Sequence, residues 1–178
     1  MDKNPARRRA RGMGLVDPGQ SFLVVSGLFT WLSPRLPGTI SAFLALPDEI
    51  DVSPLFTRLP GWRWVLPRVE VDGSLTFRDR DVPTEVHSYG MTQPVDQGPV
   101  VPVSQIDIFL APGLAFDPSG ARLGRGGGFY DRVLHERRGD AIPVGVTTDD
   151  RVVDRVPALP HDEPVTWLAT ESGVSECG

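Results

Sequence analysis

Four glycines, two arginines and an aspartate stand close together in residues 122–131. Arg122 and Arg125 lie among the glycines, and Asp131 follows them. Glycine permits backbone conformations in which several N–H groups face one side, so such a loop can hold an anion. The arginines add full charges, and a carboxylate beside a bound phosphate can hold Mg²⁺. The spacing predicts a phosphate site. An ordinary glycine-rich surface loop is the alternative, because neither the P-loop pattern nor the dinucleotide fingerprint is matched.

The loop lies between a predicted strand and a predicted helix. Residues 106–111 form a short apolar run with β-branched members that ends at Pro-Gly, which is typical of a buried strand. Residues 113–120 have the composition of a turn-rich loop, and a helix is expected from Phe129 to about Arg138. The N-terminus of a helix carries partial positive charge. Strand, loop and helix together therefore form a natural cradle for phosphate.

The remaining pattern predicts an α/β fold with a mostly parallel sheet flanked by helices. Asp17, Pro18 and Gln20 have the positions of a capping box and begin a helix that should end at Ser33-Pro34. A second, short helix should follow Ser53-Pro54. Strands are expected at residues 39–46, 62–70, 106–111, 141–147 and 165–170, with a hairpin at 69–77.

We divide the 178 residues into a basic arm at 1–14, a single α/β domain at 15–171 and a flexible tail at 172–178. The hydrophobic content of 40% suits one core. The single cysteine, Cys177, offers no disulfide within the chain, as in a reducing compartment. No apolar run has the length of a membrane span, and no clear signal peptide is present. We expect a cytoplasmic monomer without a membrane partner.

Positive charge is concentrated at the N-terminus. Residues 1–12 carry a net charge of +4, whereas the whole chain carries −5. A short basic arm can bind nucleic acid, hold phosphates or remain solvated. The chain has no aromatic-rich RNA motif, which argues against a nucleic-acid partner and favours small-molecule ligands.

Two stretches resemble the 5-formyltetrahydrofolate cyclo-ligase family, also called the methenyltetrahydrofolate synthetases. The first is Pro-Gly-Leu-Ala-Phe-Asp at 112–117, followed at 120–132 by Gly-x-Arg-Leu-Gly-x-Gly-Gly-Gly-Phe-Tyr-Asp-Arg. The second, residues 43–51, resembles the family's substrate segment. Weaker likeness extends over about residues 39–171. The resemblance implies a CoA-transferase-like three-layer architecture.

The resemblance also implies an enzyme. It would be a ligase of one-carbon metabolism that uses ATP and Mg²⁺ to convert 5-formyltetrahydrofolate to 5,10-methenyltetrahydrofolate, releasing ADP and phosphate. The formyl oxygen is a poor leaving group until ATP phosphorylates it, after which N10 attacks, the ring closes and phosphate departs. The protein would mainly position the reactants and neutralise charge.

Site residues carried over from the resemblance fall into overlapping groups. The catalytic residues are Arg122, Arg125 and Tyr130. The ATP-binding residues are Lys3, Arg7, Arg122, Leu123, Gly124, Arg125, Gly126, Gly127, Gly128, Phe129 and Tyr130. The folate-binding residues are Leu44, Glu49, Tyr89, Arg125, Gly126, Gly127, Gly128 and Phe129. The Mg²⁺ ligands are Asp131 and Asp162. On the residues alone, a solvated loop carboxylate is the favoured interpretation of Glu49. For Tyr89, a partly buried structural tyrosine has at least as much support as a ligand-stacking role.

The arm separates the remaining alternatives. Lys3 and Arg7 have the Lys-x-x-x-Arg spacing of the family's phosphate-binding helix, but Pro5 lies between them. Arg7 with Arg11 is an alternative pair. Two other functions stay open: a non-catalytic folate- or nucleotide-binding homologue of the same fold, and an RNA-binding protein that uses the arm.

Overall fold

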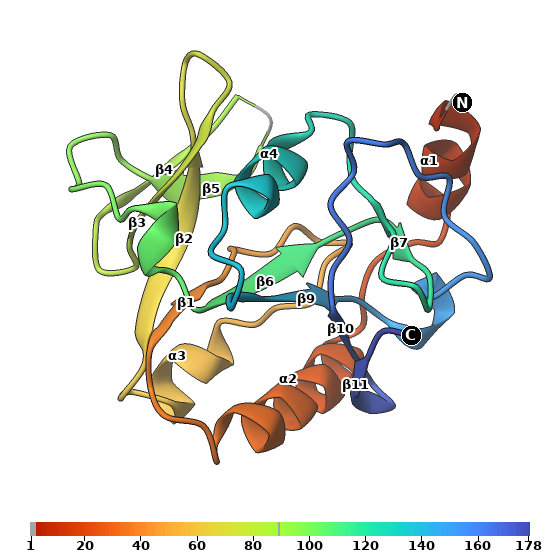
Figure 1. Ribbon diagram of the computed structural model, residues 1–178, viewed down its shortest axis with the longest axis horizontal. Coiled ribbons are helices and arrows are strands. Elements are labelled where there is room, and N and C mark those ends of the chain that lie inside the picture. Colours follow the sequence, from red (N-terminus) through yellow and green to blue (C-terminus); the bar gives the residue numbers. More distant parts are fainter. Residues whose placement is uncertain (1–2, 89) are drawn as a thin grey trace.

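The computed structural model describes residues 3–88 and 90–178, which form a seven-stranded sheet and two small two-stranded sheets. The large sheet has the order β11-β10-β9-β6-β1-β2-β3 (Figure 1). Its central strands pair in parallel, and its two edge strands, β3 and β11, are antiparallel to their neighbours. The bounds are β1 (Thr39–Ser41), β2 (Arg63–Val69), β3 (Leu75–Asp79), β6 (Ile108–Pro112), β9 (Ile142–Val146), β10 (Trp167–Thr170) and β11 (Gly173–Glu176). The predicted α/β fold with a mostly parallel sheet is confirmed.

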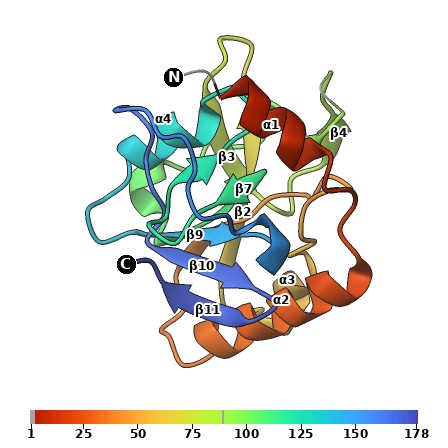
Figure 2. The ribbon, with the colours of Figure 1, turned by 90° about the vertical axis from the view of Figure 1, so that its right-hand side faces the viewer.

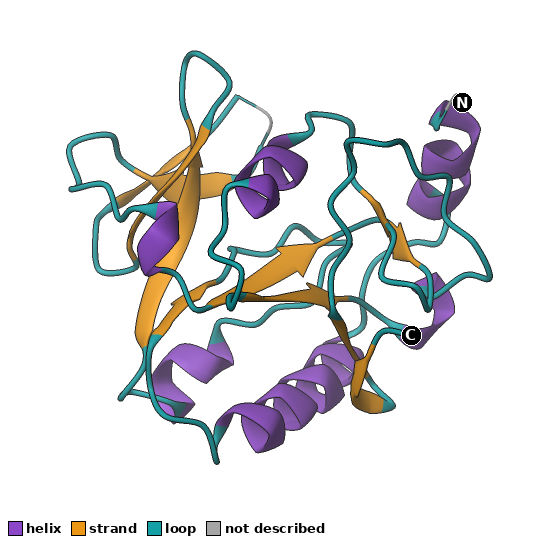
Figure 3. Ribbon diagram, viewed as in Figure 1, coloured by secondary structure: helices purple, strands orange, loops and turns teal. Residues whose placement is uncertain are grey.

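Helices lie on both faces of this sheet (Figures 1 and 3). Helices α2 (Pro18–Leu32) and α3 (Pro54–Arg58) cover one face. Helices α4 (Phe129–His135) and α1 (Asn4–Arg11) lie on the opposite side, as Figure 2 also shows from a second direction. Within the described residues, no helix combines the length and the apolar composition needed to cross a membrane.

Helix α2 begins as its sequence predicts. The Asp17 side chain accepts a hydrogen bond from the Gly19 N–H, and the Gln20 side chain accepts one from the Asp17 N–H at 2.9 Å. Its apolar face, with Leu28 and Leu32, packs into the main core together with residues of the central strands. The capping box therefore fixes where the helix starts, and the core fixes which face is buried.

Three predicted boundaries are wrong. Strand β1 ends at Ser41 instead of residue 46, because the chain then leaves the sheet and turns back at residues 46–49, where the Glu49 N–H donates to the Leu46 carbonyl. Helix α4 ends at His135 instead of about 138, because the Arg137 side chain satisfies the Leu134 carbonyl. Residues 172–178 are not a frayed tail, since they contain strand β11.

Strand β11 exists because β10 provides a partner. Gly173, with φ of 124°, makes the tight reversal between the two strands, a conformation that other residues adopt poorly. The small sheets β4 (Thr84–Val86) with β5 (Thr92–Pro94) and β7 (Ala115–Phe116) with β8 (Arg122–Leu123) lie in regions where no strand was predicted. The second of these brings Arg122 back beside the end of β6.

The loop between β7 and β8 is held by one carboxylate. Asp117 is buried and accepts hydrogen bonds from the N–H groups of Ser119, Ala121 and Val156. Burial alone would raise the pKa of Asp117, but these bonds and one from the Ser119 hydroxyl hold it below its ordinary value. The anchored loop gives the following glycine segment a fixed starting point.

Candidate active site

A cavity of about 1300 Å³ opens beyond the carboxyl ends of β1 and β6. Strand β1 has β2 on one side and β6 on the other. The strands that follow β1 therefore extend the sheet in both directions, and the strand order reverses between β1 and β6. Open α/β sheets bind ligands at such a point. Four segments provide most of the cavity lining: the arm helix, the turn after β1, the glycine loop with α4, and residues 159–163.

Most of the predicted site residues meet here. The predicted site residues that line the cavity are Lys3, Arg7, Glu49, Arg122, Gly124, Arg125, Gly126, Gly127, Gly128, Phe129, Tyr130, Asp131 and Asp162. Leu123 instead packs with Ala10 in a small satellite core. Leu44 packs against the main core, and Leu46 lines the cavity. Tyr89 lies outside the described residues, so its assignment stays a prediction.

The glycine loop has the backbone freedom that its sequence predicts. Gly126 has φ of 118° and Gly128 φ of 64°, and α4 begins directly after Gly128. A side chain on Gly127 would overlap the ring of Phe129, and one on Gly124 would press against the Arg122 guanidinium. The backbone of the loop therefore needs glycine to lie this close to its neighbours.

We expect Gly127→Val to weaken nucleotide binding more than folate binding. The added side chain would collide with Phe129 and move the amides that face the phosphates, with an expected loss of roughly tenfold or more in nucleotide affinity. Gly139→Val is the matched control, because a side chain there would meet nothing within 4 Å. Calorimetry that gives equal nucleotide affinity for both variants would contradict the prediction.

Arg122 and Asp131 form a largely buried ion pair beside Tyr130. Arg122 Nη2 donates to Asp131 Oδ1 at 2.8 Å, and the Arg122 side chain is only 4% exposed. The guanidinium lies 5.5 Å from the centre of the Tyr130 ring. In the described part of the chain, Arg122 Nε and the Tyr130 hydroxyl are buried without a hydrogen-bond partner. Since buried polar groups are normally paired, both have bonding capacity left for a ligand.

Burial raises the pKa of Tyr130 strongly, and the charge of Glu49 raises it further, although Arg122 acts in the opposite direction. The side chain is therefore a neutral phenol over the whole physiological range. A neutral phenol can donate a hydrogen bond to an oxygen that gains negative charge.

Arg125 crosses the mouth of the cavity to the turn after β1. Its Nη2 donates to Asp48 Oδ1 at 2.5 Å and to Glu49 Oε1 at 3.0 Å, and its Nε donates to Glu49 Oε1 at 3.1 Å. Partial burial alone would lower the pKa of Arg125, but the two carboxylates raise it above its ordinary value. Glu49 is fixed from behind, since its Oε2 accepts the Leu46 N–H at 3.0 Å.

The N-terminal arm is a helix that lies over the glycine loop. Pro5 is compatible with this helix because it lies in the first turn. Backbone N–H groups there have no partner within the helix, so the missing N–H of proline costs no hydrogen bond. Lys3 is buried and paired with Asp162, and Arg7 Nε donates to the Gly124 carbonyl at 3.0 Å. Arg11 also lines the cavity.

Arg151 is a residue of this region that the sequence did not reveal. It is buried, and its Nη2 donates to the Gly14 carbonyl at 2.8 Å. Gly14, with φ of 89°, belongs to the link between α1 and α2. The contact joins positions 137 residues apart, so no local pattern could signal it. Arg151 thereby fixes where the arm begins to reach over the cavity.

We expect Arg151→Gln to raise the KM for ATP about tenfold, since misplacement of binding groups by even about 1 Å can cost up to a hundredfold. The KM for the folate should stay unchanged, and Arg151→Lys should restore part of the loss. Arg155→Gln is the control, because this nearby arginine is exposed. Steady-state kinetics test this prediction. An equal KM for ATP in the Arg151→Gln and Arg155→Gln variants would show that Arg151 does not position the arm.

Two carboxylates of the cavity suit a divalent cation that comes with phosphates. Asp131 and Asp162 both line it, each paired with a cation, Arg122 and Lys3 respectively. Across residues 3–88 and 90–178, no group of three or more His, Cys, Asp or Glu side chains could hold a metal ion. Mg²⁺ is commonly bound by one or two carboxylates together with phosphate and water oxygens. The donor set therefore fits Mg²⁺ bound with a nucleotide.

The pKa of Asp162 supports a charged carboxylate at this place. Burial alone would raise it, but hydrogen bonds from Lys3 and from the Leu159 N–H hold it below its ordinary value. Asp162 is therefore ionised at neutral pH and able to ligate a cation.

Comparison with known proteins gives consistent matches. The model of the 5-formyltetrahydrofolate cyclo-ligase family matches residues 28–171. The 5-formyltetrahydrofolate cyclo-ligase of Escherichia coli K12 is 34% identical over 146 residues, which cover 78% of this chain and 80% of that protein. The same-named protein of Mycolicibacterium smegmatis is 47% identical over 72 residues, covering 40% of this chain but 37% of that relative.

A solved structure matches almost the whole chain. The NMR structure of Aquifex aeolicus 5,10-methenyltetrahydrofolate synthetase has a TM-score of 0.84 and 29% sequence identity. The match covers 99% of this chain and 93% of that structure. The arm helix and the C-terminal strand thus fall within the shared fold.

Proposed function

This chain belongs to the 5-formyltetrahydrofolate cyclo-ligase family, and we propose that it converts 5-formyltetrahydrofolate to 5,10-methenyltetrahydrofolate with ATP as the second substrate. One observation carries the proposal beyond family membership. The glycine loop, the cations Arg122, Lys3 and Arg7, and the carboxylate Glu49 all face one cavity. A cationic region for phosphates thus adjoins an acidic acceptor for a folate.

The reaction needs an activated formyl group. The γ-phosphoryl group of ATP passes to the formyl oxygen at N5, which leaves ADP and an iminium-like phosphate. The N10 nitrogen then attacks the formyl carbon and loses its proton, the five-membered ring closes, and the carbon–oxygen bond breaks to release phosphate. Each step moves negative charge onto phosphate oxygens, so the protein contributes chiefly by positioning and charge neutralisation.

Arg122 and the amides of residues 124–128 are placed to hold those oxygens. The Arg122 guanidinium is almost fully shielded from water, and charge stabilisation is stronger in such a site than in bulk solvent. Lys3 and Arg7 would reach the phosphates from the arm. Mg²⁺, when bound through Asp131 and Asp162, would neutralise further phosphate charge.

Tyr130 acts in this proposal as a hydrogen-bond donor. Its buried hydroxyl has no partner in the described part of the chain, and its raised pKa keeps the proton on the oxygen. A phenol in that state cannot serve as the base at N10. It would donate a hydrogen bond to a phosphoryl oxygen, which gains negative charge during the transfer and the release of phosphate.

The folate would lie against Glu49 and Phe129. Both line the cavity, where the Arg125 side chain joins the glycine loop to the turn after β1. Leu44 would support this wall from the core, and Tyr89 completes the set carried over from the resemblance. The expectation of a cytoplasmic monomer belongs to the same proposal and is open to light scattering and fractionation.

The test is ATP hydrolysis measured with and without 5-formyltetrahydrofolate, together with the absorbance of the methenyl product. We expect one ADP per methenyl product, and no product without Mg²⁺. A non-catalytic homologue would bind the folate or the nucleotide without turnover. Retention of random RNA with no folate-dependent ADP release would favour the RNA-binding alternative.

A further inference from the structure

The Arg125 guanidinium occupies an acceptor site made by two neighbouring acidic residues. Its three hydrogen bonds, of 2.5 to 3.1 Å, go to Asp48 and Glu49. Asp48 is 20% exposed and Glu49 9%, whereas Arg125 is 36% exposed. The acceptors are thus more enclosed than the group they bind.

Glu49, the more enclosed of the two acceptors, is also held more firmly than their occupant. Glu49 is tied to Leu46 twice, through its own N–H to the Leu46 carbonyl at 2.9 Å and through the Leu46 N–H to Oε2 at 3.0 Å. Arg125 stands between Gly124 and Gly126 on the exposed part of the loop, where the backbone is free to turn. A change of partner would therefore move Arg125 and leave the Glu49 carboxylate in place.

The chemistry of the acceptor site matches one edge of a reduced folate. The 2-amino-4-oxopyrimidine ring carries a ring N–H and an exocyclic amino group on the same carbon. This places coplanar N–H donors side by side, as a guanidinium does, and such donors suit a pair of carboxylates. The same acceptors thus fit Arg125 or the pyrimidine edge, but not both at once.

We propose that Asp48 acts with Glu49 to bind the amino-pyrimidine edge of the folate, and that Arg125 occupies this place until the folate arrives. The ligand named here rests on the proposed function, whereas the exchange of partners rests on the hydrogen bonds of Arg125. Asp48 thereby becomes a specificity-determining residue that the resemblance did not assign.

The charges of the cavity indicate where the released Arg125 goes. Lys3, Arg7, Arg11 and Arg122 line the same cavity, but Asp131 and Asp162 pair with two of these cations, so no strong net charge draws Arg125 inward while no anion is bound. Nucleotide phosphates supply that attraction. Arg11 already donates to the Arg125 carbonyl, at 3.4 Å, which keeps this residue beside the cationic region. The folate frees Arg125, and the phosphates attract it.

The two ligands should therefore strengthen each other's binding. A folate that displaces Arg125 makes it available to phosphate, and a nucleotide that holds Arg125 removes the competitor of the folate. Coupling of this kind is reciprocal, and values of about fivefold or more are common.

Calorimetry tests the exchange without any need for turnover. For the wild-type chain we expect a non-hydrolysable ATP analogue with Mg²⁺ to tighten 5-formyltetrahydrofolate binding about fivefold. Arg125→Met should bind the folate alone about threefold more tightly, the size of a partly exposed ion pair, and should lose the coupling. Asp48→Asn should bind the folate alone about tenfold more weakly and the analogue alone more tightly.

Two controls match these variants. Asp51→Asn changes the same charge on the same segment, at an exposed side chain whose oxygen accepts the Ser53 N–H, and asparagine keeps that acceptor. Arg8→Met removes one exposed arginine of the arm. Both should bind either ligand as the wild type does, and thermal unfolding should be alike in all variants.

Weaker folate binding by Arg125→Met without nucleotide would overturn the exchange, and unchanged folate binding by Asp48→Asn would overturn the role of Asp48. Turnover of the same wild-type preparation separates these failures from a failure of the proposed function. If the wild-type chain converts 5-formyltetrahydrofolate normally but the ATP analogue does not tighten folate binding, only the exchange of partners is refuted. A wild-type chain that neither binds nor converts 5-formyltetrahydrofolate refutes both.

Discussion

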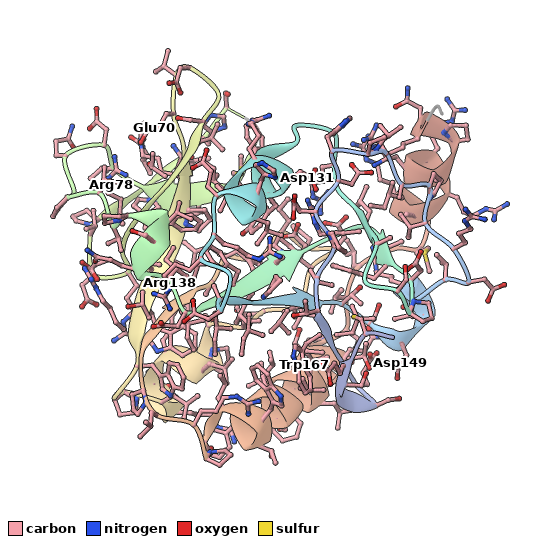
Figure 4. The ribbon with its side chains drawn as sticks, viewed as in Figure 1. Glu70, Arg78, Asp131, Arg138, Asp149 and Trp167 are labelled. Atoms are coloured by element: carbon pink, nitrogen blue, oxygen red, sulfur yellow. The ribbon has the colours of Figure 1, made fainter. Side chains whose placement is uncertain are left out.

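Asp131→Asn is expected to lower kcat by about a hundredfold or more, the size seen when one charge-stabilising group of an active site is removed. Asparagine keeps an oxygen that can accept from Arg122, but it lacks the charge that holds Mg²⁺ beside phosphates. Figure 4 places Asp131 on α4, between the strands and the arm helix. The apparent Mg²⁺ requirement should rise along with the loss of kcat.

A binding measurement distinguishes a metal ligand from a partner of Arg122. Without Mg²⁺, the variant should bind ATP at least as well as the wild type, because a neutral amide holds Arg122 less tightly than the Asp131 carboxylate does. With Mg²⁺, the wild type should bind much better. Asp140→Asn, a change at a 77% exposed carboxylate beyond the same helix, is the control. Normal Mg²⁺-dependent turnover of Asp131→Asn would remove Asp131 from the metal site.

The stability of this variant should fall only modestly. Removing one member of a buried ion pair outright leaves an uncompensated charge and costs about 3–5 kcal/mol. Asparagine retains a hydrogen-bond acceptor for the Arg122 guanidinium, so we expect a smaller loss. Circular dichroism and thermal unfolding would show whether the turnover result comes from an intact fold.

Local signals explain why the glycine loop could be predicted from the sequence, whereas Lys3, Glu49 and Asp162 were predicted from the family resemblance. The strand, the glycine loop and the helix follow one another within about thirty residues, and glycine density, Pro-Gly and a capping box each act over a few positions. The start of α2 at Asp17 and the glycine conformations at Gly126 and Gly128 agree with those rules.

Contacts between distant residues explain what was missed. Arg125 meets Asp48 across 77 positions, and Lys3 meets Asp162 across 159. Such pairs depend on how the sheet brings loops together, which no local pattern reports. Strand β11 is a similar case, since Ser175 and Glu176 lack the apolar alternation of a strand and pair because β10 is beside them. Pro5 misled in the opposite direction, because a helix tolerates proline in its first turn.

The arm divides the alternatives for function most sharply. Lys3→Gln with Arg7→Gln is expected to raise the KM for ATP tenfold or more, since charge-assisted contacts contribute roughly 1.5–3 kcal/mol each and about 1.4 kcal/mol corresponds to tenfold. Both side chains line the cavity, and Arg7 reaches the glycine loop. The folate should bind as before without nucleotide, because its predicted contacts come from other segments.

The same helix supplies a matched control. Arg8→Gln with Arg9→Gln removes the same charge from the same segment, but these two side chains are exposed and do not belong to the cavity lining. Deleting residues 1–11 is a poorer test, since Ala10 is buried with Leu114, Leu123 and Val156 and its loss would expose that cluster. Point variants keep the helix and change only its charges.

Three outcomes separate the three roles of the arm. If it binds phosphates, the Lys3 and Arg7 variant loses ATP affinity both with and without Mg²⁺, and the Arg8 and Arg9 variant does not. The measurement without Mg²⁺ matters, because Lys3 also pairs with the predicted metal ligand Asp162. If the arm binds RNA, retention of a random RNA falls in the Arg8 and Arg9 variant while catalysis stays normal. If it is merely solvated, neither variant changes either quantity, and the glycine loop with Arg122 must then anchor the phosphates without help from Lys3 and Arg7.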